Sequence, residues 1–86
     1  MKTFEFEIYL EGNVVADDQK INALYDAGCD DATFSSHYVN LVDGIPPFSV
    51  ARFSRDAETF SEVFKSAITQ LLSVEGIKIV AFSRDV

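Results

Sequence analysis

The sequence has few of the residues that cross-link, ligate or anchor small proteins. Its only cysteine, Cys29, excludes an intramolecular disulfide and a zinc cluster of paired cysteines. The four glycines are isolated from one another, so the chain has no glycine-rich phosphate loop. No apolar stretch approaches the length of a membrane span, and no basic segment followed by an apolar run opens the chain. We therefore expect a cytoplasmic protein that does not enter a membrane.

Positive charge is also scarce. Seven lysines and arginines stand against 14 acidic residues, and the net charge of −7 argues against direct binding to nucleic acid or anionic membranes. The excess lies wholly in residues 1–47, which hold two lysines and nine acidic residues, whereas residues 48–86 are balanced. Two interpretations remain open: the charge serves solubility, or it forms an acidic face that attracts a basic partner.

Large apolar side chains, in contrast, are abundant. Hydrophobic residues make up 48% of the 86 residues and include eight phenylalanines, so the chain can form a core without metal or disulfides. The length allows a single domain over residues 1–86. We expect Phe6 and Phe64 to lie in its core.

Hydrophobic periodicity predicts six elements. Residues 1–11 alternate between apolar and polar side chains, which is typical of a strand with one buried face. Asp17 or Asp18 begins a short helix that ends at Gly28. A β-rich segment starts at Ala32.

The second half begins with a loop signal at residues 43–47 and a strand over residues 48–53. Asp56 is expected to cap the second helix, and residues 77–82 form the last strand. The helix carries an apolar stripe of Ala57, Phe60, Val63, Phe64, Ala67, Ile68, Leu71 and Leu72.

The order of elements is therefore β-α-β-β-α-β. It predicts an α+β fold, a single ferredoxin-like sandwich in which two helices cover one face of a four-stranded antiparallel sheet. The first and third strands are expected at its centre.

The densest group of reactive side chains consists of Cys29, Asp30, Asp31 and His37. Their spacing matches no metal-binding or catalytic pattern that we can identify. We expect the two aspartates to form a turn and to accept hydrogen bonds from local backbone N–H groups, and Cys29 to be a small buried hydrophobe. We therefore predict no catalytic residue, no metal ligand and no cofactor site.

The open sheet face, opposite the helices, is the predicted interaction surface. If Ile77, Ile79 and Ala81 face inward, this face mixes charged and apolar side chains that suit an interface. Its members are Glu5, Glu7, Tyr9, Phe48, Val50, Arg52, Lys78, Val80 and Phe82. The opposite phase of the last strand stays open as an alternative, and it would bury Val80 and Phe82.

Two segments resemble a group of short, mostly uncharacterised bacterial proteins. One is the Gly-Cys-Asp-Asp-Ala turn at residues 28–32, and the other is the Phe-Ser-Arg-Asp-Ala segment at residues 53–57. The aromatic first strand is similar as well. In many of those proteins a helix-turn-helix segment follows, which this sequence does not contain. The resemblance implies a prokaryotic accessory module without catalytic residues.

Three functions are compatible with these patterns. The first is a non-enzymatic protein-interaction or accessory regulatory module that binds a protein partner or forms a homodimer. The second is an acidic inhibitor or nucleic-acid mimic of phage or mobile-element origin that blocks a basic protein surface. The third is a small-molecule sensor or small enzyme that uses Asp30, Asp31, His37 and Pro46-Pro47.

Overall fold

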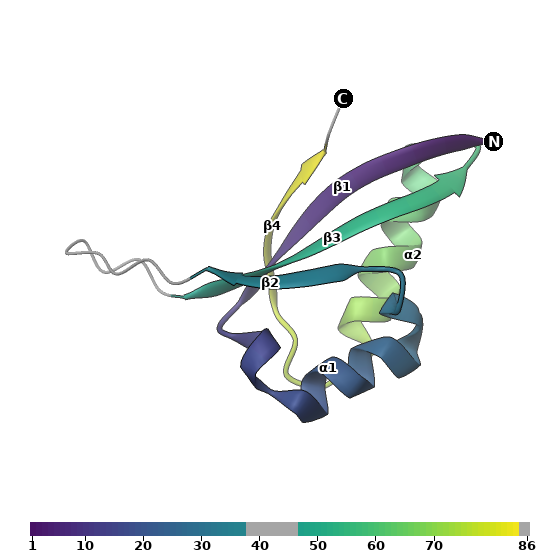
Figure 1. The fold of residues 1–86 in the computed structure, drawn as a ribbon. Coiled ribbons are helices and arrows are strands. Elements are labelled where there is room, and N and C mark those ends of the chain that lie inside the picture. Colours follow the sequence, from purple (N-terminus) through teal and green to yellow (C-terminus); the bar gives the residue numbers. More distant parts are fainter. Residues whose placement is uncertain (38–46, 85–86) are drawn as a thin grey trace.

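A computed structural model describes residues 1–37 and 47–84, which fold into one sheet with two helices (Figure 1). The predicted loop at residues 43–47 lies outside this part of the chain except for Pro47. The strands are β1 (Lys2–Glu11), β2 (Thr33–His37), β3 (Phe48–Ala57) and β4 (Ile79–Arg84), and the helices are α1 (Asp18–Leu24) and α2 (Phe60–Leu72). A 3₁₀ turn over Val14–Ala16 precedes α1, and a π turn over Tyr25–Cys29 follows it.

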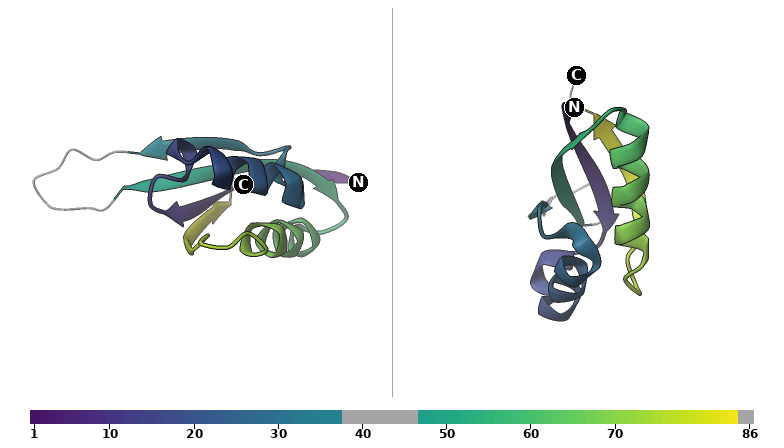
Figure 2. Two further views of the ribbon diagram at one scale, coloured as in Figure 1. Left: turned by 90° about the horizontal axis from the view of Figure 1, so that it is seen from below. Right: turned by 90° about the vertical axis from the view of Figure 1, so that its right-hand side faces the viewer.

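The four strands form an antiparallel sheet in the order β2-β3-β1-β4. The predicted α+β class is confirmed, as is the central position of β1 and β3. Both helices lie on one side of the sheet (Figure 2), where Leu24 of α1 and Val63, Ala67 and Leu71 of α2 join the same core. No helix among the described residues is long and apolar enough to cross a membrane.

The alternation in β1 produces the inner layer of this core. Phe6, Ile8 and Leu10 are fully buried, whereas Glu7 and Tyr9 between them are partly exposed and Glu5 before them is exposed. The Phe6 ring stacks on Phe53 of β3 with the ring centres 5.2 Å apart. The strand therefore has one apolar face and one polar face, as its sequence predicts.

The start of α2 differs from the prediction. β3 continues to Ala57, and the N-cap is Thr59, whose hydroxyl accepts a hydrogen bond from the Glu62 N–H at 3.3 Å. Asp56 is not a cap because it lies opposite Thr3 in the sheet and accepts a hydrogen bond from its hydroxyl. The predicted stripe is also too long at its other end, since Leu72 is 55% exposed.

The helix ends agree better with the sequence. Asp17 caps α1 by accepting hydrogen bonds from the N–H groups of Gln19 and Lys20. Gly28 follows with a φ of 108°, in the left-handed region that glycine adopts without strain.

The phase of β4 changes along its length. Ile79 lies opposite Leu10 and Ala81 opposite Tyr9, so the register skips Val80 as an extra residue. Because of this bulge, Phe82 lies opposite the inward-facing Ile8. The prediction that Phe82 belongs to the open sheet face is therefore wrong: its ring lies 4.7 Å from that of Phe64 on the helix side.

Candidate functional site

The densest polar cluster among the described residues is centred on Arg55 near the end of β3. Its guanidinium holds the Asp31 carboxylate with two parallel contacts, Nε to Oδ2 at 2.7 Å and Nη2 to Oδ1 at 3.0 Å. It also donates to Gln70 Oε1 at 2.7 Å, to the Gly28 carbonyl at 3.2 Å and to Ser66 Oγ at 3.3 Å. One arginine thus joins β3, the turn before β2 and α2.

The location of Arg55 explains why it can serve as this junction. It lies opposite Phe4 in the β1–β3 register, hence on the face that the helices cover. Its guanidinium carbon lies 4.7 Å from the centre of the Phe53 ring, a cation–π distance. The Arg55 side chain is only 12% exposed, whereas that of Asp31 is 40% exposed.

This cluster corrects the prediction for Asp31, whose carboxylate binds a side chain 24 residues away rather than local backbone N–H groups. It also joins the two segments of the bacterial resemblance, since Gly28 and Asp31 belong to one and Arg55 to the other. Sequence reasoning missed Arg55 and Gln70 as partners. The available signal was the presence of a lone arginine and an acidic pair in those two segments.

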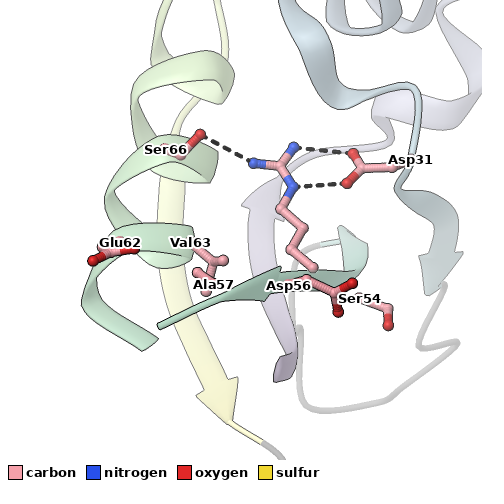
Figure 3. A pocket seen from close by; sticks show the side chains of 8 residues that line it. Asp31, Ser54, Asp56, Ala57, Glu62, Val63 and Ser66 are labelled. Carbon is pink, nitrogen blue, oxygen red and sulfur yellow. Dashed lines mark hydrogen bonds and ion pairs between the residues drawn. The ribbon is translucent and has the colours of Figure 1, made fainter. Parts of the chain in front are cut away.

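A shallow groove of about 430 Å³ borders the cluster (Figure 3). Asp31 and Ser66 point toward the guanidinium there, while Glu62 and Asp56 lie farther along its wall. Because the guanidinium already has four partners, it is poorly suited to bind an anionic substrate as well. The polar side chains at the groove therefore serve to hold β3, α2 and the turn before β2 together.

Cys29 is fully buried beside this junction. Burial raises the pKa of its thiol, while the nearby Arg55 guanidinium acts in the opposite direction. The prediction of a small buried hydrophobe is confirmed. A buried, protonated thiol is a poor nucleophile.

The predicted reactive group does not come together as a metal site in the part of the chain described. Within residues 1–37 and 47–84, no three histidine, cysteine, aspartate or glutamate side chains are placed to hold a metal ion. Asp31 is engaged with Arg55, and Asp30 is exposed in the turn. The prediction of no metal or cofactor remains a prediction.

The central strands place most of the predicted interaction residues as expected. Phe48, Val50 and Arg52 of β3 lie opposite Glu11, Tyr9 and Glu7 of β1, and Glu5 continues this row. The Tyr9 and Phe48 rings meet edge to face at 5.9 Å, and the Tyr9 hydroxyl donates to Glu7 Oε1 at 3.1 Å. Val50, however, is only 5% exposed, so it is not part of an accessible apolar patch.

The border of the sheet is more apolar. Val80 is 54% exposed and Phe82 is 55% exposed, and both belong to β4 at one edge of the sheet. At the start of this strand, Lys78 Nζ lies 3.5 Å from the Glu11 carboxylate. Lys78 therefore pairs with Glu11, the last residue of β1.

Comparison with known proteins does not assign this chain to a family. No protein-family model, curated protein or solved structure matches this chain.

Proposed function

We propose that this chain is a non-enzymatic prokaryotic module that works in the cytoplasm by associating with a protein, either a second copy or another partner. The observation that carries the proposal is the β4 edge, where Val80 and Phe82 are each more than half exposed on a terminal strand. An edge strand offers backbone hydrogen-bonding groups, and exposed apolar side chains beside them are typical of a binding surface.

We also propose that the fold is ferredoxin-like. Two features support this assignment: β3 lies between β1 and β2, and β1 lies between β3 and β4. Each β-α-β unit therefore skips one strand, as in the split β-α-β motif. This arrangement makes β2 and β4 the two edges of the sheet.

The charged residues that were predicted for the open face lie on β1, on β3 and just before β4. Glu7 lies opposite Arg52, and Lys78 pairs with Glu11, so charges of both signs alternate across the strands. Such paired charges contribute orientation and specificity more than affinity.

The same pairing makes the nucleic-acid mimic the weaker alternative. A mimic needs a row of carboxylates that remain uncompensated until a basic protein arrives. On β1, Glu7 faces Arg52 in the register and Glu11 has Lys78 beside it. The row is therefore interrupted by cations of the chain itself.

An enzyme or sensor is also less well supported. The groove at Arg55 contains a guanidinium that Asp31, Gln70, Gly28 and Ser66 already occupy. The thiol of Cys29 is fully buried. Neither feature supplies an accessible reactive group.

A photo-crosslinking amino acid introduced at position 80 tests the proposal in the native host. We expect a covalent adduct with a protein, because Val80 belongs to the proposed surface. Val15 is the matched control, since it is also an exposed valine, at 36%, but lies in the 3₁₀ turn. Adducts at neither position, or equally at both, would contradict the proposal.

A further inference from the structure

We infer that β4 pairs antiparallel with β4 of a second copy, so that two sheets join into one. This inference rests on the proposed function and names its partner. The β4 strand has six residues, about 20 Å of backbone, and its outer edge runs along the border of the sheet. A two-fold axis perpendicular to the sheet would place both copies' helices on the same face.

The distribution of charge along the chain favours a second copy as the partner of the β4 edge. The net charge of −7 belongs to residues 1–47, whereas residues 48–86, which contain β3, α2 and β4, have none. Two copies that meet through β4 would therefore bring together strands, Ile79–Arg84, that contain no acidic side chain. The opposite edge, β2, comes a few residues after the exposed Asp26 and Asp30, so two copies meeting there would bring like charges nearer to each other.

The two cations of the β4 region are already engaged within one copy. The Arg84 guanidinium carbon lies 4.3 Å from the centre of the Phe60 ring and 5.6 Å from that of Phe4. Lys78 lies beside Glu11. Both cations thus have partners within their own chain, and Val80 and Phe82 are left as the apolar contacts of the seam.

Helix α2 extends this apolar region on the helix side. The Phe82 ring of β4 lies 4.7 Å from the Phe64 ring of this helix. Leu72, near the end of the same helix, is 55% exposed. Pairing of the strands would bring the two α2 helices toward each other and cover part of this surface.

Sedimentation equilibrium tests the inference on the full chain. We expect a wild-type mass of twice 9.6 kDa, and a dissociation constant raised roughly 100-fold by Val80→Asp, because that change puts an unpaired carboxylate at the seam in each copy. The matched control is Ser35→Asp, which adds the same charge to an exposed position of the other edge strand. It should leave the constant within about threefold of the wild-type value.

A monomeric wild type at about 1 mM would overturn the pairing, as would a dimer that Val80→Asp leaves intact or that Ser35→Asp disrupts equally. If Val80→Asp fails to fold, hydrogen exchange of the wild type tests the pairing of the two β4 strands instead. Protection of β4 amides that rises with protein concentration supports the seam, and constant protection contradicts it. A monomer that still crosslinks to another protein at position 80 refutes the pairing but leaves the proposed function in place.

Discussion

Breaking the contact between Asp31 and Arg55 should destabilise the fold by an amount that lies between those for exposed and buried ion pairs. Exposed pairs contribute about 0–1 kcal/mol, and removal of one partner from a fully buried pair costs about 3–5 kcal/mol. Here the arginine is 12% exposed and the aspartate 40% exposed. We therefore expect Asp31→Ala and Arg55→Met each to lower the free energy of unfolding by about 2 kcal/mol.

The two variants lose this energy for different reasons. Asp31→Ala leaves a nearly buried guanidinium that still has Gln70, Gly28 and Ser66 as partners. Arg55→Met leaves a carboxylate that water can reach, but it removes every hydrogen bond of the cluster. Because both changes remove the same ion pair, the double variant should lose about 1–1.5 kcal/mol less than the sum of the single losses.

Urea denaturation followed by circular dichroism measures these differences. With a slope of about 1 kcal/mol/M, a loss of 2 kcal/mol lowers the midpoint by about 2 M. The exposed pair between Lys78 and Glu11 is the matched control, because its side chains are 74% and 57% exposed. Its coupling energy should be below about 0.5 kcal/mol. An equally small coupling between Asp31 and Arg55 would refute the reasoning.

The remaining predictions are checked by the same denaturation assay or by thiol labelling. Gly28→Ala should cost about 2 kcal/mol, since φ is 108° and the new Cβ would lie 2.5 Å from Gln70 Nε2. Gly12→Ala, with a φ of 81° but no atom within 4 Å, should cost about 1 kcal/mol, and equal losses would contradict this account. Phe6→Ala should cost about 3–5 kcal/mol, and Phe64→Ala, at a partly buried position, only about 1–2 kcal/mol. A larger loss for Phe64→Ala than for Phe6→Ala would contradict this assignment of the core. Cys29 should react with iodoacetamide far more slowly in the folded than in the unfolded protein, because its raised pKa lowers the thiolate fraction near neutral pH; equal rates would refute its burial. The fold favours the protonated thiol. Stability should therefore fall as the pH rises above the ordinary pKa of a cysteine thiol, and Cys29→Ala should remove that part of the pH dependence.

The elements that the sequence predicted well are those determined by local chemistry. The alternation in β1, the Asp17 cap and the Gly28 terminus each depend on residues within one strand or one helical turn. The start of α2 was predicted wrongly, because aspartate and threonine are both good caps and local sequence does not show that Thr59 takes the place of Asp56. The choice depends on the pairing of Asp56 with Thr3, which lies 53 residues away in the sequence.

In the candidate sites, too, the features that sequence analysis missed depend on residues distant in the sequence. The bulge at Val80 depends on how β4 aligns with β1, and a shift of one residue exchanges the two faces of a strand. The contact between Arg55 and Asp31 spans 24 residues and two segments with different local structure. Periodicity places side chains on a face, but it cannot identify which distant side chains meet there.

The central position of β1 has a consequence during synthesis. Its partners come late in the chain: Phe6 lies opposite Phe53 and also opposite Arg84. At roughly 5–20 residues per second, the ribosome needs several seconds to deliver residues 79–84 after β1 has emerged. Throughout that interval a strand with Phe4, Phe6, Ile8 and Leu10 is present without its final neighbours. The glutamates between them, Glu5 and Glu7, place negative charge in this segment, and such charge opposes aggregation of exposed apolar strands.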